Sequence, residues 1–194
     1  MQIPFFNNDE LKRKAQEFRN KYWGDAVPVD IEQIIEFKLR IGIIPVPNLY
    51  KQCNADALIS SDWQTIYVDN DNYLDDKCYN RLRFSLAHEI GHFVLHQELY
   101  TSFDIKSIED FYEVIEQIGR EYGIIEGHAN RFANFLLVPR DRLAAEKEKI
   151  EREYLAKYPE VSKIDSATLN SYVAIPLAKI FNVSEEAMEL SLKD

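Results

Sequence analysis

The sequence predicts an α+β fold, with a small sheet inserted between helical segments. Three observations indicate this class. Helical periodicity dominates both ends of the chain, strand-like runs cluster between residues 43 and 69, and strands and helices do not alternate as in a parallel βαβ protein. The 194 residues, 46% of them hydrophobic, are enough to build one core of ordinary size.

The first 70 residues predict two helices followed by three short strands. Residues 9–23 place apolar side chains at helical spacing, at Leu11, Ala15, Phe18 and Tyr22. A second helix is expected to begin after Asp30, which can serve as its N-cap, and to stop at Gly42. A strand ended by prolines and a β-hairpin are expected next, at residues 43–47, 55–60 and 64–69.

The rest of the chain predicts helices almost throughout. A polar turn at residues 69–76 leads into a helix that holds most of the histidines. The next helix is expected at residues 107–123, where Ser107 can cap it and Gly123 can stop it. Further helices are expected at residues 125–139 and 142–160. The chain is then expected to end in two short helices that are separated at residues 182–184. We expect a main domain at residues 1–140 and a helical C-terminal extension, residues 141–194, packed on it.

Charge and cysteine content exclude several classes of protein. Acidic residues outnumber basic ones by 33 to 23, a net charge of −10, which argues against binding a phosphate backbone but not against binding a basic protein. Cys53 and Cys78 lack CxxC spacing and are too few for a disulfide framework, although a single bridge between them stays open. We find no leader and no segment suited to span a membrane, so we expect a cytoplasmic protein.

The segment FSLAHEIGHFVLH, residues 84–96, holds three of the four histidines and predicts a metal site. On a helix, residues four apart project from successive turns about 40° apart, so His88 and His92 can bind one ion. Glu89 projects beside that ion, where it can accept a proton from water. A single histidine on a half-buried helix is usually only structural, but two at ligand spacing with a glutamate between them favour the HExxH metal-binding motif.

His96 does not fit the same site. It lies eight residues after His88, about 12 Å along the helix axis and about 80° around it, so an unbroken helix cannot direct all three rings at one ion. The spacing also differs from that of the metzincins, whose third histidine comes later and beyond a glycine. We therefore expect His96 to support the structure and not to bind the metal.

The third ligand is expected from a segment later in the chain. The carboxylates that follow the motif are Glu98, Asp104, Glu109, Asp110, Glu113, Glu116, Glu121 and Glu126. Glu126 alone begins a segment shaped to pack on the HExxH helix, because Ala129 and Ala133 follow it on nearly the same helical face and small residues let helices approach closely. His128 is the rival ligand, although it points to another side of that helix.

The segments RLRFSLAHEIGHFVLH and EGHANRFANFLLVP together resemble the ImmA/IrrE family of metallo-endopeptidases. This family pairs an HExxH helix, introduced by an R-x-R-F-T/S-L-A segment, with a later E-x-x-A-N-x-F-A-x-x-L-L-x-P helix. Here these segments are residues 81–92 and 126–139. The earlier PVDIEQIIEFKLRIGIIPV is also similar to the usual opening of the family.

This resemblance implies a fold, a site and a function. The fold would be zincin-like, with a small twisted sheet whose edge strand can hold an extended peptide. The expected ligands of a zinc ion, or of manganese, are His88, His92 and Glu126, with Glu89 as the catalytic base. Family members cleave helix-turn-helix repressors in bacteria and phages and so release stress-response or mobile-element genes. The resemblance thus implies a zinc-dependent endopeptidase that acts on such a repressor.

Several points stay open at the level of sequence. The strand near residues 65–69 is expected to pair with the substrate, while Tyr67, Tyr122 and His128 are unranked candidates for stabilising the oxyanion. The C-terminal end of the chain has the pattern of a helix-turn-helix, but its last helix is acidic. This charge argues against DNA binding and favours core packing or the docking of a basic repressor. The alternative function is a regulatory module, stabilised by metal, that sequesters a repressor without cutting it.

Overall fold

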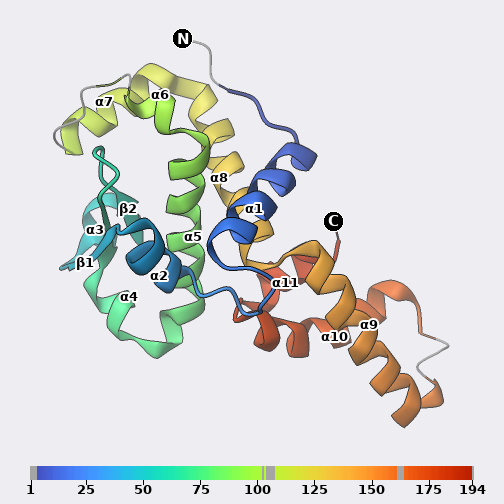
Figure 1. Ribbon diagram of the computed structural model, residues 1–194. Coiled ribbons are helices and arrows are strands. Elements are labelled where there is room, and N and C mark those ends of the chain that lie inside the picture. Colours follow the sequence, from blue (N-terminus) through green and yellow to red (C-terminus); the bar gives the residue numbers. More distant parts are fainter. Residues whose placement is uncertain (1–3, 102, 104–107, 161–163, 194) are drawn as a thin grey trace.

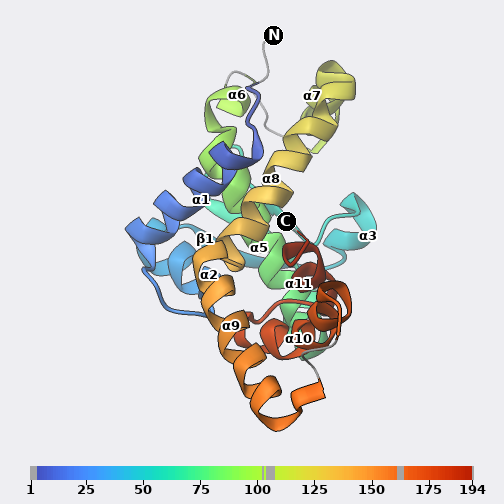
Figure 2. The same cartoon turned by 90° about the vertical axis from the view of Figure 1, so that its right-hand side faces the viewer.

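The computed structural model describes residues 4–101, 103, 108–160 and 164–193, and its architecture is α+β as predicted. The described chain is mostly helical and holds a three-stranded mixed sheet. Two long helices, α5 (Tyr79–Leu95) and α8 (Tyr122–Leu137), pack against each other at the centre (Figure 1). The sheet lies on one side of α5, and α1 (Asn8–Tyr22) packs against α8 (Figure 2).

The second helical segment starts as predicted and ends earlier. The Asp30 side chain accepts a hydrogen bond from the Gln33 amide and so caps α2 (Ile31–Gln33). The helix continues as a π-helical turn, Ile34–Leu39, and then ends because the next residue, Arg40, is left-handed. Gly42 therefore does not stop this helix, as the sequence suggested, but opens the first strand.

The sheet has the strand order β1-β3-β2, with β1 (Gly42–Val46), β2 (Ala57–Ile59) and β3 (Thr65–Asp69). A short helix, α3 (Leu49–Cys53), connects β1 to β2. β2 and β3 form the predicted antiparallel hairpin, whereas β1 pairs with β3 in parallel. The prediction that β3 pairs with a substrate is therefore wrong, because other strands occupy both of its sides. The two edges of the sheet belong to β1 and β2.

The polar segment before α5 is helical, where the sequence predicted a simple turn. Asp69 caps α4 (Asn70–Leu74) by accepting hydrogen bonds from two amides of its first turn. A 3-10 turn, Asp76–Cys78, then leads into α5. Cys53 and Cys78 are both free thiols, so the disulfide that the sequence left open does not form.

The helices between α5 and α8 differ from the prediction at a glycine. α6 (Gln97–Thr101) follows α5, and α7 spans Ile108–Ile118. α7 ends before Gly119, whose φ of +62° is left-handed, while the predicted stop, Gly123, lies inside α8. The predicted cap Ser107 lies outside the described residues.

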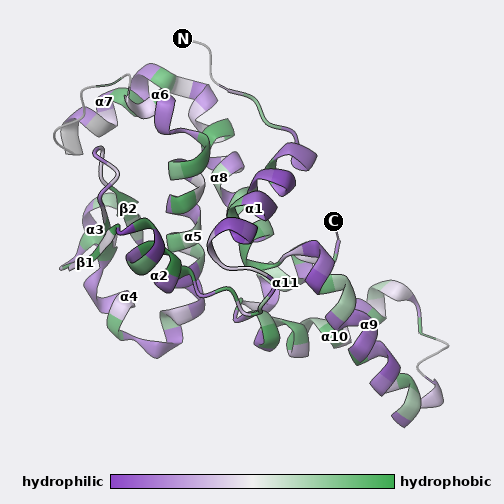
Figure 3. Ribbon diagram, viewed as in Figure 1, coloured by the Kyte–Doolittle hydropathy of each residue, from purple (hydrophilic) through white to green (hydrophobic). Residues whose placement is uncertain are grey.

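Three C-terminal helices complete the described chain, α9 (Arg140–Lys157), α10 (Ser166–Phe181) and α11 (Glu185–Ser191). Side chains of α10 and α11, such as Phe181 and Met188, join the same hydrophobic core as α5 and α8. α5 is mostly hydrophobic, whereas the outlying α9 is mostly hydrophilic (Figure 3). The division of the chain at residue 140 stays a prediction. Among the described residues, no helix is long and apolar enough to cross a membrane.

Candidate metal centre

His88 and His92 project from successive turns of α5 toward α8, where Glu126 faces them. The Nε2 atoms of the two histidines lie 2.9 Å apart. One carboxylate oxygen of Glu126 lies 3.3 Å from Nε2 of His88, and the other lies 3.3 Å from Nε2 of His92. The structure thus brings together the three predicted ligands, with one ligand atom from each within 4.8 Å of the others.

The spacing and chemistry of these atoms fit a small cation. Ligands that bind zinc tetrahedrally at about 2.0–2.1 Å lie about 3.3 Å from one another. The two histidine–glutamate separations match this value, and the histidine–histidine separation of 2.9 Å is slightly shorter. All three groups offer lone pairs, which repel one another unless a positive charge lies between them. Their role as ligands stays a prediction.

Glycine at position 91 allows α5 and α8 to approach this closely. A Cβ atom on Gly91 would lie 2.9 Å from Cα of Ala129 and 3.0 Å from its carbonyl oxygen. Such contacts are too short for any larger residue without a backbone shift. The glycine of the HExxH motif and the first alanine of the second motif therefore set the distance between Glu126 and the two histidines.

Two further residues fix the histidine rings from behind. Nδ1 of His88 lies 2.9 Å from Oδ1 of Asn130, and Nδ1 of His92 lies 3.1 Å from Nδ1 of His96. Burial, reinforced by the charges of His92 and His128, lowers the pKa of His96 to about 3, so its ring stays neutral. A neutral His96 can accept a hydrogen bond from the Nδ1–H group of His92, which leaves Nε2 of His92 available to a metal. This is the supporting role predicted for His96.

His128, the rival ligand, lies away from the convergent group. Its Nε2 atom accepts a hydrogen bond from the Phe6 amide at 3.3 Å, and its ring stacks on that of His96. Among the other candidate ligands, Asp104 and the side chain of Glu109 lie outside the described residues.

Glu89 is held beside the metal ligands by the edge of the sheet. Its Oε2 atom accepts a hydrogen bond from the Ile59 amide at 2.9 Å. The backbones of residues 56 and 60 form hydrogen bonds with the β3 strand and its last residue, Asp69. Because successive residues of a strand direct their backbone groups to opposite sides, those of Ala57 and Ile59 face the outer edge of β2. Burial raises the pKa of Glu89, although the nearby His92 and His88 oppose the shift.

Two tyrosines lie near Glu126. Burial raises the pKa of Tyr122, and the Glu126 carboxylate raises it further, so the hydroxyl keeps its proton. Tyr100 behaves in the same way, and its ring lies edge-on to His92 at 5.9 Å between centroids. Protonated hydroxyls can donate to an oxyanion. Sequence reasoning missed Tyr100, because it lies in α6, outside both motifs.

The arginines that introduce the HExxH helix have structural contacts. Nε of Arg81 lies 2.7 Å from Oδ2 of Asp56, just before β2, and the guanidinium lies over the Tyr50 ring. Arg83 is buried and donates to the carbonyl of Val29 at 2.7 Å. These contacts tie α5 to the sheet and to the segment before α2, so they orient the helix that carries Glu89.

Comparisons with known proteins concern the family and the fold of the chain. The model of the IrrE N-terminal-like domain, of the peptidase M78 family, matches residues 75–193. A solved Mycobacterium tuberculosis transcriptional regulator has a similar fold, with a TM-score of 0.56 and 16% identity over 95% of this chain. The present chain spans 46% of that structure. No curated protein matches the chain significantly. Since the family match covers more than half of the sequence, including both motifs, the chain belongs to the family of IrrE N-terminal-like domains.

Proposed function

We propose that this protein is a zinc-dependent endopeptidase that cleaves a helix-turn-helix repressor and so relieves repression. The observation that carries the proposal is the meeting of His88, His92 and Glu126 beside the buried carboxylate of Glu89. A structural metal site has no use for a base at that position. The peptidase family supports the reaction class, and the similar Mycobacterium tuberculosis transcriptional regulator supports a link to the control of transcription.

The protein groups around the site have distinct roles in peptide hydrolysis. A zinc or manganese ion held by His88, His92 and Glu126 would supply a Lewis acid for the scissile carbonyl and for water. Glu89 accepts the proton of the attacking water and delivers it to the leaving amine. Its hydrogen bond to the β2 backbone keeps the carboxylate in place. Tyr122 and Tyr100 are the candidates to stabilise the oxyanion.

The outer edge of β2 is the proposed docking strand for the substrate. An extended peptide that adds to this edge pairs with the backbone of Ala57 and with the carbonyl of Ile59, while the Ile59 amide donates to the carboxylate of Glu89. Cleavage then requires the scissile segment to be extended, so a repressor has to expose or unfold that segment. The net charge of −10 favours the approach of a basic, DNA-binding partner.

Incubation of the purified chain with a helix-turn-helix repressor tests the proposal. We expect repressor fragments when the metal is present, and none after a chelator has removed it or when Glu89→Gln replaces the native chain. Restored cleavage on adding zinc would identify the cofactor. A stable complex in which the repressor stays intact with metal bound would instead support the regulatory module that sequesters without cutting.

A further inference from the structure

A further histidine, His128 of α8, lies behind the metal centre. Its side chain is buried and lies outside the proposed ligand set. The His128 ring stacks on the ring of His96, with 5.8 Å between the centroids and 19° between the planes. Since Nδ1 of His96 in turn lies 3.1 Å from Nδ1 of His92, two contacts join His128 to a proposed metal ligand.

The stack on His128 holds the side of the His96 ring that faces away from His92. His96 uses Nδ1 for its contact with His92, and its buried Nε2 atom has no hydrogen-bond partner in the part of the chain that the structure describes. The ring therefore depends on packing to keep its orientation. If it turned about its Cβ–Cγ bond, Nδ1 would move away from His92 and this ligand would lose its acceptor.

The N-terminal segment holds His128. The Phe6 amide donates to Nε2 of His128 at 3.3 Å, and the rings of Phe5 and Phe6 lie edge-on to the His128 ring, at 6.0 and 5.3 Å between centroids. An amide donates only to an unprotonated ring nitrogen, so the proton of His128 lies on Nδ1. Nδ1 is buried without a partner among the described residues, so the Phe6 amide provides the hydrogen bond that fixes this ring.

The cap of α1 holds the Phe6 amide in this place. The Asn7 side chain accepts a hydrogen bond from the Glu10 amide, and the Glu10 carboxylate accepts one from the Asn7 amide, which makes a capping box. Phe6 comes directly before this cap and packs against the core that contains Leu11, as in a hydrophobic staple. Because α1 packs on α8, the start of α1 brings the Phe6 amide to His128.

We propose that His128 is a positioning residue of the metal centre. The start of α1 fixes the His128 ring, this ring fixes that of His96, and His96 keeps Nε2 of His92 directed at the ion. Core packing alone does not account for a histidine at position 128, because a buried N–H group without a partner costs stability that an apolar side chain would avoid. The inference rests on the metal site of the proposed function and extends it to the N-terminal segment.

Zinc affinity of the full-length chain, measured by competition with a chelator, tests this role. His128→Leu keeps all three ligands, so one ion should stay bound, but about three- to tenfold more weakly, which is less than the loss of a direct outer partner costs. The absorption spectrum of bound Co²⁺ depends on ligand geometry and should change in the same variant. Phe181→Leu is the control for lost packing, because Phe181 is buried in α10, and it should leave the affinity and the spectrum unchanged.

Two changes at Phe6 test the contribution of the N-terminal segment. Both remove the ring, but only Phe6→Pro also removes the amide donor. Phe6→Ala should therefore stay within about twofold of the native affinity, whereas Phe6→Pro should weaken zinc binding about three- to tenfold. If His128→Leu fails to fold, this pair decides in its place, and equal affinities for the two Phe6 variants would overturn the proposal.

The double variant tests whether Phe6 and His128 act in one path. Phe6→Pro combined with His128→Leu should bind zinc no more weakly than His128→Leu alone, because the amide acts through the ring. Effects that multiply would show that the two residues act separately, and would overturn the proposal. Native affinity and spectrum in His128→Leu would overturn the role of His128 while leaving the metal centre in place. A native chain that binds no zinc would overturn the metal centre and this role together.

Discussion

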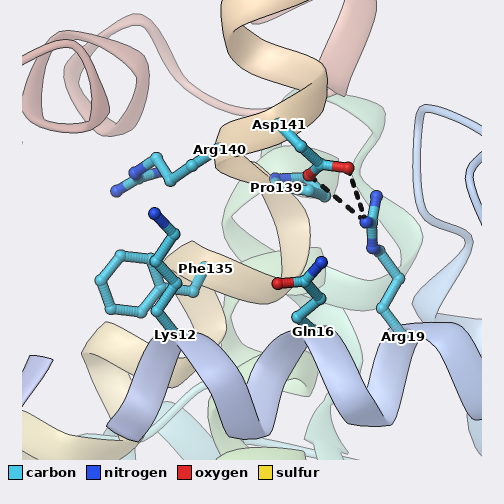
Figure 4. A pocket seen from close by; sticks show the side chains of 7 residues that line it. All are labelled: Lys12, Gln16, Arg19, Phe135, Pro139, Arg140 and Asp141. Atoms are coloured by element: carbon cyan, nitrogen blue, oxygen red, sulfur yellow. Dashed lines mark hydrogen bonds and ion pairs between the residues drawn. The ribbon is translucent and has the colours of Figure 1, made fainter. Parts of the chain in front are cut away.

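The two ends of α8 hold two polar groups that the chain assembles in different ways. Near its start, Glu126 meets two histidines of α5, so the groups there donate lone pairs and suit a cation. Near its end, Phe135 lines a cavity at which Arg19 of α1 forms an ion pair with Asp141 of α9 (Figure 4). Two neighbouring helices and two short motifs build the first site, whereas the second joins side chains about 120 residues apart in sequence, such as Arg19 and Asp141. The predictions below test the first of these two ends.

The largest effect is expected from Glu126→Ala. Loss of a residue that only supports a ligand by a hydrogen bond lowers metal affinity by up to roughly 100-fold. Loss of one of the three ligands themselves should lower it further, and cleavage should disappear. Metal content after dialysis, measured by mass spectrometry, checks this. His128→Ala, two residues away, is the control and should keep one ion. Retention of a full equivalent of metal by the Glu126 variant would refute the ligand assignment.

Glu89→Gln should remove activity while keeping the metal. The amide is nearly isosteric with the carboxylate, but it cannot accept a proton from water, so the rate of cleavage should fall by roughly 10² to 10⁴. Repressor cleavage and metal content are measured on the same sample. Normal cleavage by this variant would exclude Glu89 from the reaction.

His96→Ala should weaken the metal site without emptying it. The variant removes the acceptor behind His92, and loss of such an outer partner typically lowers metal affinity about 10–100-fold. His96→Asn offers a carbonyl oxygen in nearly the same place, so we expect it to recover part of the affinity. Competition with a chelator of known affinity gives the values. Equal affinities for both variants would show that the contact with His92 has no part in metal binding.

Much of the metal site near the start of α8 could be predicted from the sequence, because each of its two motifs lies within a single helix. The i, i+4 spacing in α5 and the small residues after Glu126 each describe one helix face, and the structure brings those faces together. The helix ends were harder, since Gly42 and Gly123 look like stops although Arg40 and Gly119 adopt the left-handed conformations that end those helices.

The features that escaped prediction depend on contacts between distant segments. The sequence predicts that β3 pairs with β2, but nothing within β3 reveals that β1 pairs with its other side in parallel. Tyr100 and Asn130 reach the histidine rings only after α6 and α8 have packed. The cavity at the far end of α8 has no motif at all, because its cations lie in separate helices and appear in sequence as ordinary surface charges.

The smallest effect is expected from Gly91→Ala compared with Gly127→Ala. Both changes add a methyl group inside a helix, where alanine is favoured over glycine by about 1 kcal/mol. At Gly127 no atom lies within 4 Å of the new Cβ, so we expect a gain of up to that amount in the free energy of unfolding.

At Gly91 the new methyl group meets the backbone of Ala129 at 2.9 Å, and overpacking of this kind costs about 1–3 kcal/mol. Gly91→Ala should therefore be about 1–3 kcal/mol less stable than Gly127→Ala, as measured by urea unfolding. Because the clash pushes α8 away from α5, metal affinity should fall as well. Equal stability of the two variants would show that the contact of position 91 with Ala129 does not limit the approach of α5 and α8.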